Sequence, residues 1–160
     1  MRKAVLRIIP MRRSHVQDCL AITAISEPWQ TLNEQVDFLP YLSSKQAYVA
    51  LLNDTVAGFV IFTPEPVFAR GGYLRAIGVA ADRRRSGIGS KLLAFAEDKT
   101  RRLSDNLYLC VSSFNHRGQA FYKSLGYTRA GSLKDLIAPG TSEHIYWKKL
   151  TCHPASHTKK

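Results

Sequence analysis

The segment from residue 72 to residue 101 constrains the fold most, because a strand, a basic glycine-containing loop and a helix follow one another directly. Residues 72–79 are mainly apolar, with Tyr, Ile and Val side chains that favour strands. Residues 87–101 carry apolar side chains at the spacing of one helical face, namely Ile88, Leu92, Phe95 and Ala96. The loop between these elements is therefore expected to lie at the N-terminus of a helix.

This loop has the chemistry of an anion-binding site. The first backbone N–H groups of a helix lack internal partners, and the helix dipole places about half a positive charge there. Gly87 and Gly89 remove side chains that would keep phosphate oxygens away from these donors, and Arg83, Arg84 and Arg85 add positive charge. The spacing fits neither the GxGxxG loop of dinucleotide-binding folds nor the GxxxxGKS/T loop of nucleoside triphosphatases. The sequence therefore predicts a phosphate site of another kind.

The remaining elements also mix helices and strands. Residues 4–9 predict a strand that Pro10 ends, and Ser14 is the expected N-cap of a helix that runs to Ile25. A capping box at residues 31–34 predicts a second helix. Further along the chain we expect strands at 47–52, 56–62, 107–112, 127–131 and 144–150, and a helix at 115–125. The predicted order is βααβββαβαββ.

Composition limits the partners and the compartment. We expect one domain over residues 1–150 and a disordered tail over residues 151–160. The net charge of +11 favours a polyanionic partner, such as nucleic acid, an acidic lipid or a ligand with several phosphates. No apolar run approaches the roughly 20 residues of a membrane span, and the three cysteines lack the paired spacing of a zinc site. We therefore expect a cytoplasmic protein that binds no membrane and no metal.

Two motifs resemble those of one family. Arg84, Gly87 and Gly89 form an RxxGxG pattern between a strand and an amphipathic helix, which resembles the acetyl-CoA signature of the GNAT superfamily of N-acetyltransferases. Residues 115–127 read N-x(5)-FY-xx-LGY and resemble the second signature of that family. The element order over residues 6–150 is also similar to the GNAT fold. The resemblance implies an α/β (α+β) fold with a central mixed, mostly antiparallel sheet of about seven strands and helices on both faces.

The resemblance implies an N-acetyltransferase of the small, single-domain bacterial type, with acetyl-CoA as acyl donor and a primary amine as acceptor. The amine attacks the thioester directly in a ternary complex, and Tyr122 protonates the departing thiolate. Asn115 contacts the pantetheine arm, and the backbone groups of Ile77 and Val79 pair with pantetheine and polarise the thioester carbonyl, with Gly78 easing a bulge in the strand. The expected acetyl-CoA contacts are Ile77, Gly78, Val79, Arg84, Arg85, Ser86, Gly87, Ile88, Gly89, Ser90, Asn115 and Tyr122.

The general base is less well defined by sequence. Some family members carry a glutamate where this chain has Tyr73, and a phenol with a reference pKa of about 10 is a poor base. Glu27, Glu34 and Glu143 are other candidates, and Glu27 and Glu143 belong to segments that border the acceptor site in the family. Ordered water alone is a further alternative. We take Glu27 and Glu143 as the candidate bases.

Three residues are predicted to meet the acceptor, namely Trp29, Tyr73 and Arg75. A charged residue in a central strand is costly unless it is paired or faces a cavity. We therefore expect Arg75 to face the acceptor pocket, where it would pair with Glu143 or with an acidic group of the substrate. Trp29 could line this pocket together with Phe38 and Tyr41, although aromatic residues in this region could equally be packing.

Several alternatives stay open. The acceptor could be a small-molecule amine or amino acid, or else a protein N-terminus, as in acetylation of ribosomal proteins. A non-catalytic acyl-CoA sensor would keep the binding loop without transfer. A nucleic-acid-binding module would explain the charge, but no RRM, KH, zinc-finger or helix-turn-helix signature is present. Homodimers are common in the superfamily, although no residue of this sequence requires one.

Overall fold

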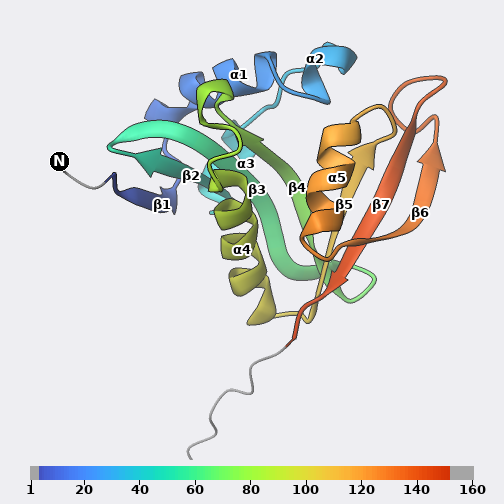
Figure 1. The fold of residues 1–160 in the computed structure, drawn as a ribbon. Coiled ribbons are helices and arrows are strands. Elements are labelled where there is room, and N and C mark those ends of the chain that lie inside the picture. The colour runs from blue at the N-terminus through green and yellow to red at the C-terminus, as the bar shows by residue number, and fades with distance from the viewer. Residues whose placement is uncertain (1–3, 152–160) are drawn as a thin grey trace, which may run out of the picture.

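A seven-stranded sheet runs through the computed structural model, which describes residues 4–151 (Figure 1). Neighbouring strands follow the order β1-β2-β3-β4-β5-β7-β6, and every pair is antiparallel except β4 with β5. The strands are β1 (Leu6–Pro10), β2 (Ala47–Leu52), β3 (Thr55–Phe68), β4 (Gly71–Val79), β5 (Asn106–Ser112), β6 (Thr128–Lys134) and β7 (Ser142–Lys149). This architecture confirms the predicted mixed, mostly antiparallel sheet.

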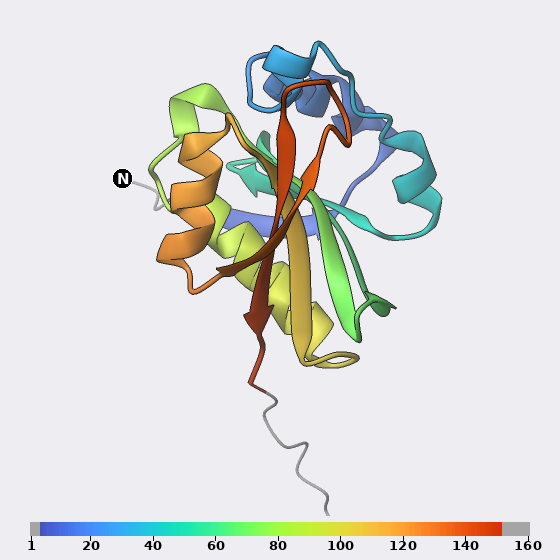
Figure 2. The same cartoon turned by 90° about the vertical axis from the view of Figure 1, so that its right-hand side faces the viewer.

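Helices cover both faces of the sheet. They are α1 (Val16–Ala24), α2 (Trp29–Leu32), α3 (Leu39–Ser43), α4 (Ile88–Arg101) and α5 (His116–Ser124), with short 3-10 turns at Arg13–His15 and Ala81–Arg83. Figure 2 shows α4 and α5 on one side of the sheet and α3 on the other. Apolar side chains gather under both layers because alternate residues of a strand point to opposite faces.

Two apolar clusters correspond to the two faces. The first lies under α4 and α5 and includes Leu74, Leu92, Leu109, Val111 and Tyr122. The second lies under α1 and the α2–α3 connection and includes Cys19, Ile22, Phe38, Phe59 and Ala76. The central strands of the sheet are thus mostly buried, whereas the edge strand β6 is mostly exposed.

The strands separate between β4 and β5. These two strands pair only through residues 72–74 and 107–109, so the rest of β4 and the end of β5 diverge. On its other side β4 stays paired with β3, where Ile61 opposes Ala76 and Phe62 opposes Leu74. Arg75 is therefore the extra residue of a β-bulge, which bends β4 at the start of the divergence.

The N-terminal helices differ from the prediction. Ser14 lies inside the 3-10 turn, and α1 begins at Val16 with no side-chain cap. Thr31 lies within α2 rather than at its start, and its hydroxyl donates to the Glu27 carboxylate (2.7 Å). Helix α3 was not predicted, because its five residues are too few to show a helical period. The predicted tail beyond residue 151, with Cys152, and the first three residues lie outside the described part of the chain.

Candidate functional site

The loop between β4 and α4 ends in exposed helical N–H groups. Gly87 is the N-cap of α4 and has φ 83°, while Arg85 has φ 61°. The first turn closes when the Lys91 N–H donates to the Gly87 carbonyl (3.1 Å), so the N–H groups of Ile88, Gly89 and Ser90 precede the helical bonding pattern. A side chain on Gly87 would meet no described atom within 4 Å, which leaves the approach to these donors open.

The arginines of this loop have different surroundings. The Arg84 guanidinium donates from Nη2 to the Ser26 hydroxyl (2.9 Å) and to the Ile25 carbonyl (3.2 Å), so it ties the loop to the end of α1. Arg83 pairs with Asp82 (3.2 Å), and Arg85 is exposed. The RxxGxG arginine therefore shapes the loop in this structure, whereas a direct contribution of its side chain to anion binding would require a different rotamer.

Packing requires glycine at position 78, and the β-bulge does not. A Cβ at this position would lie 2.5 Å from the Phe59 ring and 3.1 Å from Ile22, so only glycine allows this close approach. The break in register lies at Arg75 instead. The sequence expectation that Gly78 eases the bulge was wrong in this respect, whereas the expected divergence of β4 from its neighbour is confirmed.

Helix α5 directs Tyr122 inward. Asn115, at the start of the helix predicted over residues 115–125, is its N-cap, and the Asn115 Oδ1 accepts from the Gly118 N–H (2.9 Å). Tyr122 is only 7% exposed and packs edge-on against the rings of Phe121 and Tyr127. Phe121 and Leu125, one turn apart on the same helix, are only half-buried.

The Tyr122 phenol is neutral and unpaired. Burial raises its pKa well above that of a free phenol, and the nearby Tyr73 raises it further. Its hydroxyl has no hydrogen-bond partner among residues 4–151. Tyr122 belongs to the cluster under α4 and α5, whereas Tyr73 alternates with Leu74 of that cluster and faces the opposite way. The two phenols therefore lie near the start of the divergence of β4 from β5, close enough to interact electrostatically.

A carboxyl group lies on the Tyr73 side of this gap. Glu143 of β7 is 6% exposed and stands opposite Ser112 of β5, whose hydroxyl donates to Glu143 Oε1 (2.5 Å). Burial raises the pKa of the Glu143 carboxyl, Ser112 opposes this shift, and the charge of Glu34 adds to it. A carboxylate with a raised pKa is a better proton acceptor near neutral pH than an exposed one.

Tyr73 interacts electrostatically with Glu143, Cys110 and Arg75. Burial raises the pKa of Tyr73, the neighbouring Cys110 and Glu143 raise it further, and Arg75 opposes them. Tyr73 lowers the pKa of the Cys110 thiol, although burial has the larger effect and raises it. Cys110 and Ser112 were not predicted as site residues. Their alternation with the buried Leu109 and Val111 is the sequence signal that could have placed both on the Tyr73 face.

Arg75 does not pair with Glu143. Its guanidinium lies over the rings of Tyr41 (5.6 Å to the centroid) and Tyr73 (5.7 Å), and the residue is exposed. Within residues 4–151 it forms no ion pair. The expected Glu143 pairing was therefore wrong, because the bulge at Arg75 sends the side chain towards α3 and the aromatic rings satisfy part of its charge.

The other predicted site residues lie on or near the N-terminal helices. Glu27 is exposed, and its carboxylate accepts a hydrogen bond from the Thr31 hydroxyl. Trp29 is half-buried against Phe59, with 6.0 Å between ring centroids, and Phe38 packs edge-on against the same ring (5.0 Å). Phe38 is thus a core residue. The roles of Glu27 as a base and of Trp29 as an acceptor contact stay predictions.

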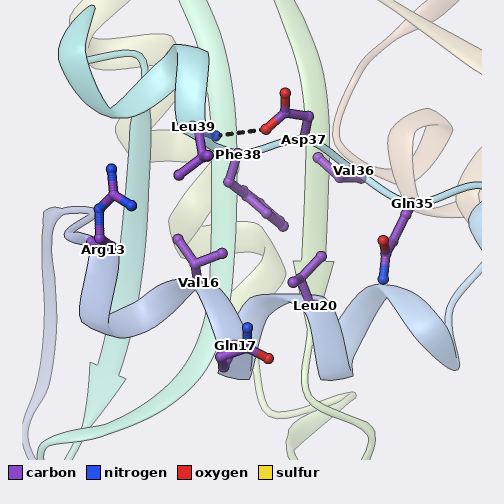
Figure 3. Close-up of a pocket in the computed structure, with 9 residues that line it drawn as sticks. All are labelled: Arg13, Val16, Gln17, Leu20, Gln35, Val36, Asp37, Phe38 and Leu39. Carbon is purple, nitrogen blue, oxygen red and sulfur yellow. Dashed lines mark hydrogen bonds between the residues drawn. The ribbon is translucent and has the colours of Figure 1, made fainter.

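A hollow of about 400 Å³ lies elsewhere, between α1 and residues 35–39 (Figure 3). Val16, Leu20 and Phe38 form its apolar floor, and the Asp37 carboxylate at its rim accepts from the Leu39 N–H (3.1 Å). Of the residues predicted to line the acceptor pocket, it includes Phe38 but neither Trp29 nor Tyr41. The gap between β4 and β5 is a separate feature.

Within residues 4–151, no group of three or more His, Cys, Asp or Glu side chains is placed to hold a metal ion. No helix in that range combines the length and apolar character needed to cross a membrane. Three groups therefore lie around the gap: the neutral phenol of Tyr122, the carboxyl of Glu143 with its raised pKa, and the N-terminus of α4 with its free N–H groups.

Comparison with known proteins gives one family. The model of the Acetyltransferase (GNAT) family matches residues 12–127. A curated relative, the blasticidin-S acetyltransferase of Streptomyces morookaense, is 33% identical over 72 residues, which are 45% of this chain and 52% of that protein. The match thus spans about half the length of this relative.

Solved structures agree in fold. The ribosomal-protein-S18-alanine N-acetyltransferase of Escherichia coli superposes with a TM-score of 0.72 and 20% identity, covering 98% of this chain and 99% of that one. Arabidopsis thaliana Naa50, solved with the bisubstrate analogue CoA-Ac-MVNAL, has a TM-score of 0.72 and 18% identity over 91% of this chain and 99% of its own. At such identities the likeness concerns the fold alone.

Proposed function

Because this chain belongs to the GNAT family of acetyltransferases, we propose that it transfers the acetyl group of acetyl-CoA to the primary amine of a small molecule. The proposal is carried by the gap between β4 and β5, which lies near the β4–α4 loop, the Tyr122 phenol and the Glu143 carboxyl. Direct attack in a ternary complex suits this arrangement, since the two reactants can enter from opposite sides. Membership of the family supports acetyl-CoA as the acyl donor, and the side chains around the gap support the mechanism.

The acetyl-CoA pyrophosphate would bind at the N-terminus of α4. The N–H groups from Ile88 to Ser90 donate to its oxygens, and the helix dipole and Arg85 add favourable charge. Gly87 and Gly89 leave room for the oxygens, and the backbone of Arg84 and Ser86 completes the loop. Beyond it, the pantetheine arm would lie along the free edge of β4, taking the place of a paired strand.

The contacts with pantetheine come from backbone and amide groups. Ile77 and Val79 flank Gly78 on the divergent part of β4, and a backbone N–H there would donate to the thioester oxygen as negative charge develops. Asn115 uses its Oδ1 to cap α5, which leaves its Nδ2 as the donor for the arm. Both kinds of group are held by secondary structure, so little reorganisation is needed on binding.

The proton transfers follow from the two sides of the gap. The amine nitrogen attacks the thioester carbon, and its proton passes to the Glu143 carboxylate, directly or through water. As the carbon–sulfur bond breaks, Tyr122 gives its proton to the leaving sulfur and later regains one from solvent. The raised pKa of Tyr122 keeps the phenol protonated before each turnover. Glu143 supports this role better than Glu27 because it alone of the two borders the gap.

The test is release of free CoA thiol from acetyl-CoA in the presence of single acceptors. The acceptors are small amines, amino acids, polyamines and N-terminal peptides, and acetyl-CoA binding is measured separately by calorimetry. Release with small amines supports the proposal, and release with peptides alone would assign the chain to N-terminal acetylation. Binding without release for any acceptor would favour a non-catalytic sensor, and absence of binding would refute the donor assignment.

A further inference from the structure

Arg75 carries an exposed charge that the rings of Tyr41 and Tyr73 satisfy in part. It is the extra residue of a β-bulge in the middle of a central strand, where a charge is unfavourable unless it has a partner. The residue is nevertheless exposed, on the sheet face that carries Tyr73 and Glu143. The Tyr41 and Tyr73 rings hold the guanidinium at 5.6 and 5.7 Å but leave its N–H groups without an acceptor carboxylate among residues 4–151. An anion could therefore bind there without displacing an internal partner.

A carboxylate lies on the same face of the sheet. The Arg75 guanidinium lies 5.7 Å from the centroid of the Tyr73 ring, and Glu143, which is held by Ser112 of β5, also interacts electrostatically with Tyr73. Glu34 adds a second carboxylate near Glu143. The sheet face that carries Tyr73 thus has a positive charge at Arg75 and a carboxyl group at Glu143. A ligand with one amine and one carboxylate a few bonds apart would match both ends, whereas a polyamine would meet repulsion at Arg75.

We propose that the acceptor is a zwitterion of the amino-acid class, whose carboxylate pairs with the Arg75 guanidinium while its amine lies beside Glu143. This inference rests on the proposed acetyl transfer and narrows its substrate. A planar guanidinium held between two rings can present two parallel N–H donors to a carboxylate, which is the favoured geometry of such pairs. Arg75 is then a specificity-determining residue, and the bulge serves to orient it.

The experiment compares matched acceptors. Each amino acid of the panel is assayed beside its carboxamide and its decarboxylated amine, so that only the carboxylate changes. With the unmodified protein, kcat/KM is expected to favour the acid by about 10- to 100-fold over its amide, as a hydrogen-bonded charged pair predicts. The difference should appear mainly in KM, because Arg75 binds the acceptor and takes no part in the proton transfers.

Three variants test the assignment. Arg75→Gln should remove the preference for the acid and leave kcat/KM for amides nearly unchanged, and Arg75→Lys should retain part of it because the charge remains. Arg7→Gln removes a positive charge at β1, where it pairs with Asp54, and should keep the full preference. Thermal unfolding and acetyl-CoA affinity, measured for all variants, separate a folding defect from a change in acceptor binding.

The outcomes distinguish this inference from the transfer itself. Equal rates with acids, amides and decarboxylated amines would overturn it while leaving acetyl transfer intact. Acetylation of uncharged, amidated peptides as efficiently as amino acids would also overturn it. If no amine of any kind released CoA, both the transfer and the inference would fall. A preference for acids that persists in Arg75→Gln would assign the carboxylate to another residue.

Discussion

Replacing Tyr122 by Phe should separate catalysis from stability. The Tyr122 ring is 7% exposed and contacts Phe121 and Tyr127, with ring centroids 5.1 and 5.8 Å apart, and Phe keeps both contacts. Its hydroxyl forms no hydrogen bond with another described residue, and it is not among the fully buried polar atoms that lack a partner. Removing it should therefore change the free energy of unfolding by less than about 1 kcal/mol.

The same variant should lower turnover much more than it changes stability. A positioned general acid contributes about 10²- to 10⁴-fold to a proton-transfer step, which corresponds to about 2.7–5.4 kcal/mol of barrier. We expect kcat to fall by at least the lower factor. The KM for acetyl-CoA should change little, because the phenol acts on the leaving sulfur rather than on the bound donor.

Tyr146→Phe is the matched control. Tyr146 is fully buried in the same apolar cluster, and its hydroxyl is also without a partner in the described chain, but it lies outside the proposed site. Both variants are assayed by thiol release under acetyl-CoA saturation and by chemical denaturation. An unchanged kcat in Tyr122→Phe would refute the acid role, and an equal loss in both variants would show that core packing, not the phenol proton, controls the rate.

Because burial raises the pKa of Glu143, kcat/KM should fall as the pH drops through that raised pKa, and Glu143→Gln should abolish this pH dependence. The same variant should not lower the free energy of unfolding at neutral pH. The reason is that the stability contributed by a protonated Glu143 is lost as the pH rises through its folded pKa. Gly87→Ala, at φ 83°, should cost about 1 kcal/mol and weaken acetyl-CoA binding in calorimetry, whereas Gly87→Asn should do so less. Glu97 accepts from Tyr127 (3.0 Å) and Lys148 (2.9 Å), so Glu97→Gln should lower the unfolding free energy by about 1–3 kcal/mol with acetyl-CoA binding unchanged; unaltered denaturation would contradict it.

Local signals predicted most of the fold. The strand, loop and helix over residues 72–101 were confirmed almost to the residue, because helical periodicity and glycine act over a few neighbours. The helix predicted over residues 115–125 was confirmed for the same reason, and Asn115 is its N-cap. Prediction failed where short-range preferences compete, as at Ser14 and Thr31, whose capping tendencies yielded to the packing of α1 and α2 on the sheet.

The sequence by itself determined the family, the strand–loop–helix segment around Gly87 and the helix that carries Tyr122, since these depend on motifs carried by contiguous residues. Only the tertiary structure decided which side chains meet at the gap. Glu143 reaches Ser112, 31 residues away, because β7 pairs with β5 in one register, and Arg75 turns from Glu143 towards Tyr41 because of a bulge set by pairing with β3. Strand register and bulges depend on contacts between distant segments, so a single sequence does not disclose them.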